Sequence, residues 1–570
     1  MAGKTLIGGT AYDISGGKTL VGGTAYSISG GKTLVDGTEY DISFAKIVPL
    51  PAAGAYLTFS SPSSFTISTN NKTKNWDGEL QYYNDTGRWE AWDGTSAISS
   101  IRTELGEAIF MRGSTNTRIT ANSSSYRWVI DGSNVSCSGN IESLLDYGLV
   151  DMGKQPSMST YCYAYIFYKC SSLIQAPTLP AVTLVNGCYT SMFDSCTNLT
   201  TPPALPATTL AEYCYSAMFR ACTSLTSAPE LPATTLARSC YLQMFYNCSK
   251  LAQTPALPAT TLANYCYNYM FYRCIELTQA PALPATTMAT YCYSGMFYGC
   301  TSLTSAPELP ATTLADNCYS SMFYECKKLT SAPKLPATTL ANTCYNAMFY
   351  GCTGLTSAPE LPATRLANNC YKQMFRLCTG LTTAPALPAT TLANYCYEYM
   401  FNGCSNLTKA PSLPATTLTD GCYRYMFRQC SKLTAAPTLP ATTMAAYCYY
   451  NMFASCTGLT TAPALPATTL ADQCYYYMFY DCISLYAIPK LPATTLTTYC
   501  YYGMFYGCDK VLLSDSLTGE YTQAYRIPTS GTGTIADNAL GAMFQITGGT
   551  FTGTPTINTT YYLSNTNTIV

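Results

Sequence analysis

The chain has 570 residues, with 30 lysines and arginines, 31 aspartates and glutamates, and no histidine. Charged residues make up 11 % of the chain, against an average of about 25 %, so neither a basic nucleic-acid stripe nor an acidic tail is present. The lack of histidine removes the commonest general base and metal ligand, and the 48 % apolar content argues against a wholly disordered chain.

A repeat of 14 residues occupies the N-terminus: the segment that begins at Gly3 recurs from Gly17 and from Gly31. Each copy places apolar residues on both sides of a Gly-Gly or Asp-Gly pair, such as Asp36-Gly37. This pattern predicts three β-hairpins over residues 1–50. Such short hairpins cannot bury a core alone, so they need a sister chain or a socket in a larger assembly. A flexible peptide arm is the alternative.

The first residues of the chain show no charged segment followed by an apolar run, so we expect no secretory signal. We therefore expect the protein to fold in the cytoplasm of the cell that makes it. No stretch of about 18 apolar residues is present, and we expect no insertion into a membrane.

Residues 51–143 combine short alternating runs, such as Tyr56–Phe59, with Asp-Gly turns. This combination predicts a small β-sandwich. Tryptophans on such a module stack on sugars if they are exposed, but more often they form the core. All the tryptophans of the chain lie here: Trp76, Trp89, Trp92 and Trp128.

Cysteines mark a second, longer repeat. One series runs from Cys162 to Cys500 in steps of 26 residues, and the other runs from Cys170 to Cys508 in the same steps. Together they define 14 copies without insertion or deletion, and only Cys137 stands outside. Such regularity predicts a solenoid over residues 144–510, in which each copy buries its apolar face against its neighbours.

Positions within a copy are counted from the first cysteine as 0. Positions 0, +1, +4, +5 and +8 scarcely vary, whereas +2, +3, +6 and +7 do. At roughly 100° per residue the constant positions share one arc, which predicts a helix of about 12 residues from near Leu262 to near Cys274, capped by Thr260 or Thr261. The predicted core of two successive copies is Cys266, Met270, Phe271, Cys274, Cys292, Met296, Phe297 and Cys300.

The rest of each copy, such as Leu277–Pro284, predicts a short strand that leads into a loop. Because proline cannot donate to a sheet, we expect two to four paired residues per copy, ending at or before the first proline. A strand and a helix per copy make an α/β solenoid, a leucine-rich-repeat-like right-handed superhelix of 14 rungs. The small β-sandwich and the β-hairpin repeats precede it.

After Cys508, about 13 extra residues intrude before a degenerate copy, in which Ala539 replaces the first cysteine and Met543 keeps position +4. An atypical last copy is what a solenoid needs to cover its terminal apolar face. Residues 511–570 are therefore predicted to form a C-terminal cap.

The consensus CYxxMFxxCtxLtxAPxLPATTLAxx resembles the 26-residue bacterial surface-protein repeat, a relative of the BspA-like leucine-rich repeats, over roughly residues 145–508. The stretch from Leu80 to Tyr147 also resembles the module that often precedes such repeats. Members are mostly adhesins, or proteins of unassigned role, in gut bacteria and their phages. The resemblance implies binding to a surface and no known chemistry. Segments similar to residues 1–50 begin tailed-phage structural proteins, which implies a virion anchor.

The cysteines admit two interpretations. In the predicted helix the two cysteines of one copy lie about 12 Å apart, too far for a disulfide, and the short ligand spacing of zinc clusters is absent. We interpret them as small buried apolar side chains, and we expect neither a metal nor another cofactor. A disulfide or metal framework is the alternative.

Position +6 lies opposite the predicted core and carries tyrosine in eight of the 14 copies. Stacked phenols on the convex side would suit a carbohydrate, a protein or a neighbouring copy of the chain. Repeat expansion without function is the alternative. Besides Tyr168 and Tyr246, the candidate contact residues are Tyr272, Tyr298, Tyr324, Tyr350, Tyr480 and Tyr506.

These features favour a non-enzymatic phage virion fibre or decoration protein. Residues 1–50 would anchor it to a virion protein, and the solenoid would attach to glycans or proteins of the host surface. We expect a homo-oligomer, a trimer by analogy with other virion fibres, and no nucleic-acid partner. The alternative is a bacterial cell-surface adhesin. A glycan-cleaving tailspike would need paired carboxylates about 5–10 Å apart, and no acidic pair recurs in the copies.

Overall fold

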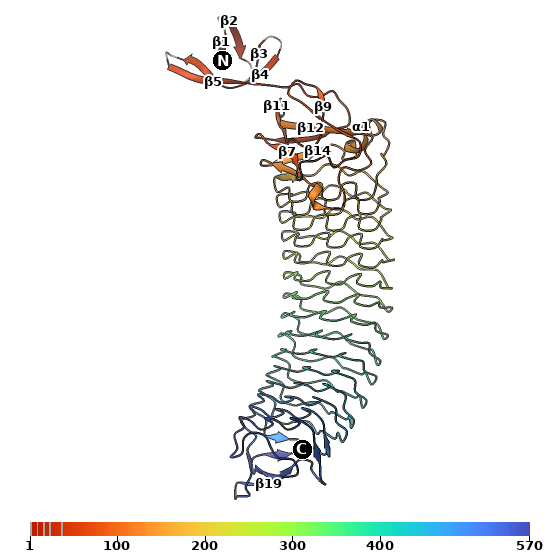
Figure 1. The fold of residues 1–570 in the computed structure, drawn as a ribbon, viewed down its shortest axis with the longest axis vertical. Helices are drawn as coiled ribbons and strands as arrows, with labels where there is room; N and C mark the ends of the chain where they lie inside the picture. Colours follow the sequence, from red (N-terminus) through yellow and green to blue (C-terminus); the bar gives the residue numbers. More distant parts are fainter. Residues whose placement is uncertain (1–2, 8–9, 15–17, 22–23, 36–37) are drawn as a thin grey trace. The chain divides into compact units, whose positions relative to one another are not determined.

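The computed structural model describes residues 3–7, 10–14, 18–21, 24–35 and 38–570, with side chains from residue 47 onward (Figure 1). The chain divides into two compact units, Met1–Leu231 and Pro232–Val570, hereafter unit 1 and unit 2. Unit 1 contains the N-terminal strands, a β-sheet module and the first three 26-residue repeats. Unit 2 contains the other eleven repeats and the C-terminal residues. Each repeat is named here by its first cysteine.

The N-terminal repeats form antiparallel strand pairs. Strand β1 pairs with β2, β3 pairs with β4, and β4 continues into a pairing with β5. The β1–β2 and β3–β4 pairings each lie within one 14-residue copy, as the apolar residues on both sides of the glycines predict, whereas the β4–β5 pairing runs from Tyr26 to Lys46 and so includes residues of two copies. The Asp36-Gly37 pair lies outside the described residues. The strands are β1 (Gly3–Ile7), β2 (Thr10–Ile14), β3 (Lys18–Val21), β4 (Thr24–Val35) and β5 (Thr38–Lys46).

Two sheets form the module that follows, so the predicted β-sheet region before the repeats is confirmed. The larger has the order β15-β14-β6-β12-β8-β9, with β11 paired to β12, and the smaller has the order β10-β7-β13. The elements are β6 (Leu57–Ser61), β7 (Thr66–Thr69), β8 (Glu79–Tyr83), β9 (Trp89–Ala91), β10 (Ile98–Ser99), β11 (Ile101–Thr103), β12 (Gly106–Ser114), the 3-10 helix η1 (Ser124–Tyr126), β13 (Trp128–Asp131), β14 (Val135–Ser138), the helix α1 (Ser143–Asp151) and β15 (Leu173–Gln175).

Aromatic rings fill the core of this module. Phe59 on β6 and Trp128 on β13 are fully buried, and their ring centroids lie 6.4 Å apart. Trp76 and Trp92 are also buried and stack at 5.0 Å. Trp89 is half-buried. Three of the four tryptophans therefore form core, which leaves no open sugar platform at those three positions.

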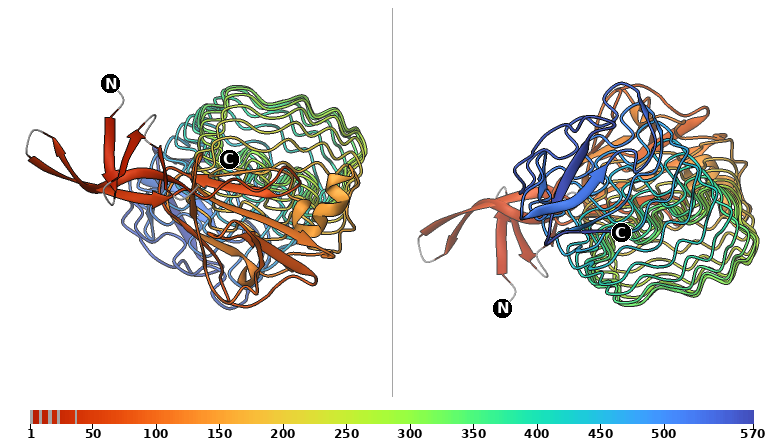
Figure 2. Two further views of the ribbon diagram at one scale, coloured as in Figure 1. Left: turned by 90° about the horizontal axis from the view of Figure 1, so that it is seen from above. Right: turned by 90° about the horizontal axis from the view of Figure 1, so that it is seen from below.

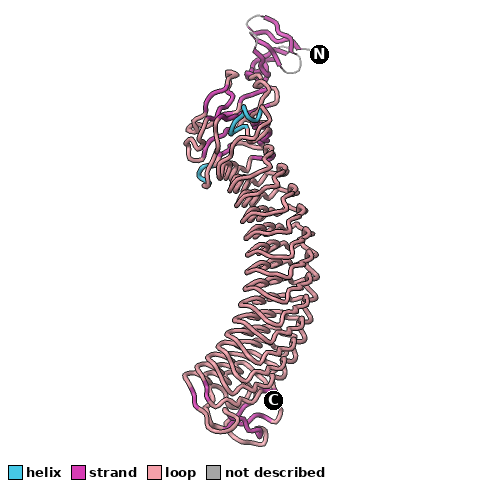
Figure 3. Tube along the Cα trace, turned by 90° about the vertical axis from the view of Figure 1, so that its right-hand side faces the viewer, coloured by secondary structure: helices cyan, strands magenta, loops and turns pink. Residues whose placement is uncertain are grey.

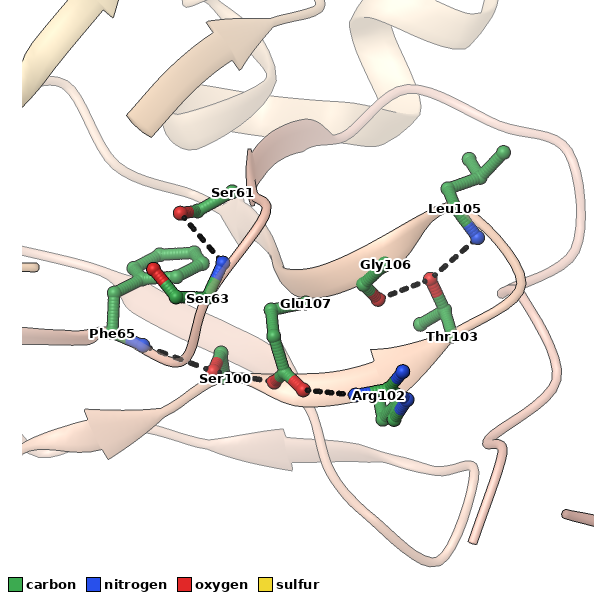
Figure 4. A network of polar contacts seen from close by, with 9 residues as sticks. All are labelled: Ser61, Ser63, Phe65, Ser100, Arg102, Thr103, Leu105, Gly106 and Glu107. Carbon is green, nitrogen blue, oxygen red and sulfur yellow. Dashed lines mark hydrogen bonds and ion pairs between the residues drawn. The ribbon is translucent and has the colours of Figure 1, made fainter. Parts of the chain in front are cut away.

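A polar network fixes the edge of the module next to the β11–β12 turn (Figure 4). The Ser100 hydroxyl accepts a hydrogen bond from the Phe65 amide at 3.1 Å and donates to the Glu107 carboxylate at 2.8 Å. The other oxygen of Glu107 lies 3.8 Å from the Arg102 guanidinium. The network ties the β10–β11 connection and β11 to β12, because Ser100 and Arg102 both contact Glu107.

The helix predicted near Leu262–Cys274 is wrong, and so is the helical part of the predicted fold class. Among the described residues, α1 is the one α-helix, and the repeats consist almost wholly of turns and loops (Figure 3). In every repeat, positions −1, +3 and +7 have positive φ. In the Cys266 repeat these are Tyr265, Tyr269 and Arg273, with φ of 59°, 53° and 54°. A left-handed residue at every fourth position converts the segment into a chain of tight turns.

The hydrogen bonds of this turn segment, positions −1 to +8, alternate between two directions. The amide of Met270 donates to the Tyr267 carbonyl three residues back, at 3.1 Å. The next amide, that of Phe271, donates to the Met296 carbonyl of the following repeat, at 2.9 Å. The same alternation holds along the segment, so half of the donors that an α-helix would use internally join neighbouring repeats. These bonds offset the strain of the left-handed residues, about 1–2 kcal/mol each.

Single bridges replace most of the predicted strands. Gln279 pairs with Ser305 just before the prolines, so the predicted end of the pairing is confirmed while its length is overestimated. Thr287 pairs with Thr313 in a second column. Thr261 belongs to that column through its bridge to Thr235 and caps no helix. Longer pairings occur near the end of unit 2, in β16 (Ala487–Ile488) and β17 (Thr495–Leu496).

Aromatic columns form the core of unit 2, whose repeats superpose when viewed end-on (Figure 2). Tyr267 stacks on Tyr293 at 5.7 Å, and Phe271 stacks on Phe297 at the same distance. All eight residues predicted as core of the Cys266 and Cys292 repeats have 0 % exposure: Cys266, Met270, Phe271, Cys274, Cys292, Met296, Phe297 and Cys300. Fixed spacing brings identical side chains into register in every repeat, which is the packing a solenoid requires.

Both ends of the repeat array are covered. In unit 1 the Trp128 amide donates to the Ile166 carbonyl at 2.8 Å, so the sheet module supplies the partners that a preceding repeat would. In unit 2 the Tyr501 amide donates to the Ala539 carbonyl at 2.9 Å, and Ala539 takes the place of the first cysteine, as predicted. The C-terminal strands are β18 (Leu513–Ser514), β19 (Tyr521–Arg526), β20 (Thr534–Ile535), β21 (Thr560–Ser564) and β22 (Thr568–Ile569).

Candidate functional site

All 29 cysteines are buried free thiols. The second cysteine of a repeat has a role that the sequence did not suggest: the Cys300 thiol lies 3.1 Å from the Phe271 carbonyl of the preceding repeat and donates to it. Cys326 and Phe297 repeat this contact at 3.1 Å. An apolar residue of similar size would fill the space but could not donate. Burial raises the pKa of the Cys404 thiol to about 12, so such thiols stay protonated.

We expect the native protein to resist thiol alkylation. Because the thiolate is the nucleophile, burial and raised pKa values together should leave essentially no cysteine reactive at about pH 8. Mass spectrometry after brief maleimide treatment should show the unmodified chain, and the same treatment in guanidinium should add up to 29 labels. Fast labelling of many cysteines in the native protein would contradict the packing described above.

Tyrosines at position +6 form a continuous stack in unit 2. Adjacent ring centroids lie 4.2, 4.7, 4.2 and 4.2 Å apart. These distances are shorter than the 5.7 Å of the buried tyrosine column, although the rings are nearly parallel in both. We call this stack the tyrosine ladder: Tyr246, Tyr272, Tyr298, Tyr324 and Tyr350. A second, looser pair, Tyr480 and Tyr506, stacks at 5.3 Å.

The ladder tyrosines are half-buried rather than exposed as predicted, because each ring covers the face of its neighbour. Their edges form a narrow amphipathic strip. The Tyr324 hydroxyl forms hydrogen bonds with those of Tyr298 and Tyr350, and burial raises the pKa of Tyr324 well above its ordinary value. The strip is therefore uncharged and offers apolar ring edges beside hydroxyl groups. In unit 1, Tyr168 packs edge-on against Tyr165 instead.

A charged cluster adjoins the ladder and was missed from the sequence. Lys372, Glu398 and Arg424 occupy position +2 of three successive repeats. The Glu398 carboxylate is 5 % exposed and lies 2.8 Å from the Lys372 ammonium and 3.5 Å from the Arg424 guanidinium. The signal was present: alternating charges at one position of consecutive copies. The helical interpretation assigns position +2 to the variable surface, where it predicts no such cluster.

Shallow grooves between the proline segments form a separate surface. One is lined by prolines on two successive repeats: Pro255, Pro258, Pro281 and Pro284. The lining of this groove includes no charged side chain, whereas equivalent grooves include Lys409 in one case, and Lys334 and Glu360 in another. The grooves are shallow and open, whereas the tyrosine ladder presents a continuous row of rings and hydroxyl groups, so the ladder is the better candidate.

Residues 153–251, 211–330, 265–408 and 346–486 match the profile described as the BspA type leucine-rich repeat region. Together these matches cover more than half of the chain. The chain belongs to the BspA-type leucine-rich repeat family. Members of this family are typical of surface and adhesion proteins. The resemblance stated from the cysteine and leucine spacing is thereby confirmed at the level of the repeat, and the leucine-rich-repeat solenoid with its 26-residue period is established.

No curated protein sequence matches this BspA-type chain. Among solved structures, similarity extends to the crystal structure of a TLR13–ssRNA13 complex, with 14 % sequence identity and a TM-score of 0.22. The aligned part covers 58 % of this chain and 45 % of that chain, so the match spans less than half of the other protein.

Within the described part of the chain, no three cysteine, aspartate or glutamate side chains lie close enough together to hold a metal ion. Across the same described ranges, no helix combines the length and apolar character needed to cross a lipid bilayer.

Proposed function

We propose that the protein is a non-enzymatic attachment protein, a phage virion fibre or decoration protein, that presents its tyrosine-lined face to glycans or proteins of the host-cell surface. Residues 1–50 would fix it to a virion protein, and the working form would be a homo-oligomer, with a trimer as the first candidate. A cell-surface adhesin of a bacterium is the second candidate, because BspA-type repeats are typical of such proteins.

The tyrosine ladder is the observation that carries this proposal. Its rings are held by a backbone that bonds repeat to repeat, so little conformational entropy is lost when a ligand binds. Tyrosine combines a large contact area with a polar hydroxyl, a combination enriched in protein recognition surfaces. The paired strands β1–β5 support the anchor, because such strands gain stability by joining a larger sheet.

Binding of the purified chain to host cells tests the attachment role. The double substitution Tyr298→Ser and Tyr324→Ser should weaken binding at least about tenfold, as expected for central aromatic contacts. Lys327→Gln and Lys328→Gln, two exposed charges outside the turn segment that carries the ladder, serve as the control and should leave binding unchanged. Equal loss in both variants, or in neither, would contradict a role for the ladder.

Mass spectrometry of purified virions, with immunogold labelling against residues 150–510, separates the two candidates. Peptides in the particles, with gold at one site, are the expected result for a virion fibre. Label on cell envelopes and none on particles would establish the cellular adhesin instead.

A further inference from the structure

We propose that a cationic surface next to the tyrosine ladder binds a carboxylate-bearing saccharide. This inference rests on the proposed attachment function and names a ligand class for it. The site, which we call the cationic patch, lies on the turn segments of the Cys370 and Cys422 repeats in unit 2. It consists of Lys372, Arg376, Arg424 and Arg428.

The protein neutralises the cations of the patch only in part. Glu398 is the one carboxylate in the turn segments of the Cys370, Cys396 and Cys422 repeats, and its two ion pairs go to Lys372 and Arg424. Arg376 and Arg428 form no ion pair with any described carboxylate. Their Nε atoms are buried and have no hydrogen-bond partner among the described residues. A surface anion would therefore meet an excess of positive charge in a chain whose net charge is −1.

Aromatic rings hold these cations in place. The Arg376 guanidinium carbon lies 4.8 Å from the Tyr399 ring centroid and 5.4 Å from that of Tyr350, the last ring of the tyrosine ladder. The Arg424 guanidinium lies 4.9 Å from the Tyr450 ring. Such cation–π contacts restrain a long side chain before the ligand arrives. The patch is therefore continuous with the ladder and preorganised for an anion.

The arrangement fits an acidic sugar better than other anions. A guanidinium fork matches the two oxygens of a carboxylate, while tyrosine edges beside it suit the apolar faces of a sugar ring. The patch extends over only two repeat-to-repeat steps, each near 5.7–5.8 Å in the buried tyrosine column. Nucleic acids depend on a longer series of phosphate contacts for their affinity. A short run of uronate or other carboxylate sugars matches both the length and the charge.

Isothermal titration of the full chain with trigalacturonate tests the inference. The fully methyl-esterified trisaccharide, which has the same backbone without charge, is the matched ligand control. We expect the wild-type chain to bind trigalacturonate at least about tenfold more tightly than the ester, with affinity falling as salt rises. The double substitution Arg376→Gln and Arg428→Gln should weaken binding about tenfold or more. The surface control Lys327→Gln and Lys328→Gln removes the same charge and should bind as the wild type does.

Arg428→Lys keeps the charge and removes the fork, so it should bind severalfold more weakly than the wild type. Equal binding of acid and ester, unchanged binding in the double glutamine variant, or binding of a single-stranded oligonucleotide in place of trigalacturonate would each overturn the inference. The outcomes separate it from the attachment function. If the ladder variant loses host-cell binding but the wild-type chain does not bind trigalacturonate, only the saccharide inference is rejected. If the wild-type chain binds trigalacturonate but does not bind host cells, only the attachment role is rejected.

Discussion

Phe323→Ala should lower the free energy of unfolding of unit 2 locally by about 3–5 kcal/mol. Phe323 is fully buried and stacks between Phe297 at 5.7 Å and Phe349 at 5.6 Å. The substitution keeps the backbone contacts, because the amide still donates to Met348 and the carbonyl still accepts from the Cys352 thiol. The loss therefore reports the ring and the cavity it leaves.

Hydrogen exchange is the appropriate measurement, because a repeat array unfolds in segments and a single melting temperature averages over them. Amides of the Cys292, Cys318 and Cys344 repeats should exchange faster, while those near the C-terminal cap should change less. Lys327→Ala, an exposed site in the same repeat, is the control. If hydrogen exchange and the melting temperature of Phe323→Ala hardly differ from those of the wild type, Phe323 lies outside the core.

Gly351→Ala should destabilise unit 2 by about 1–2 kcal/mol, because alanine would have to adopt a left-handed conformation. Gly351 has φ of 68°, and an added Cβ would lie 3.1 Å from the flexible Cγ of Glu325, so the backbone cost dominates. In a helix the same substitution would stabilise by about 0.5–1 kcal/mol. Guanidinium denaturation of the variant therefore distinguishes the two backbones by the sign of its effect.

Ala347→Gly, in the same turn segment, is the reciprocal control. Ala347 has φ of 51°, so glycine relieves strain and should leave stability unchanged or raise it by up to about 1 kcal/mol. A helix would instead lose about 1 kcal/mol. If Gly351→Ala stabilises the protein and Ala347→Gly destabilises it, the segment is an α-helix and not a series of left-handed turns.

The burial pattern could be predicted from the sequence, but the backbone that produces it could not. Two fully buried positions followed by two that are on average less buried repeat every four residues in the turn segment, whereas a helix repeats every 3.6. The two periods differ by only about 40° per turn, and the constant residues span just two turns. Both backbones therefore place Met270 and Phe271 inside.

The positions of glycine are the sequence feature that distinguishes left-handed turns from an α-helix. Several repeats carry it at positions −1, +3 or +7, all with positive φ, whereas a helix interior disfavours it. Such repeated placement at four-residue intervals fits left-handed turns. These glycines are Gly187, Gly295, Gly299, Gly351, Gly403, Gly421, Gly503 and Gly507.

The tyrosine ladder and the cationic patch differ in how far the sequence reveals them. Tyr272 and Tyr298 occupy equivalent positions, so fixed spacing alone brings them together. The patch depends on contacts between different positions, such as Arg376 at +6 and Tyr399 at +3 of the next repeat. Their proximity follows from the turn geometry, which the helical interpretation did not contain.

The alternation of hydrogen bonds also bears on how such a chain changes over generations. Each repeat receives and supplies the same amides and carbonyls at its two sides, so one more copy of 26 residues would meet compatible partners on both. Apart from a whole copy, an insertion within a turn segment whose length is not a multiple of four would shift left-handed positions onto residues that should face the core. Recombination between near-identical copies can thus lengthen or shorten unit 2 by whole repeats. The length of the repeat array can therefore change between generations while the core packing stays the same.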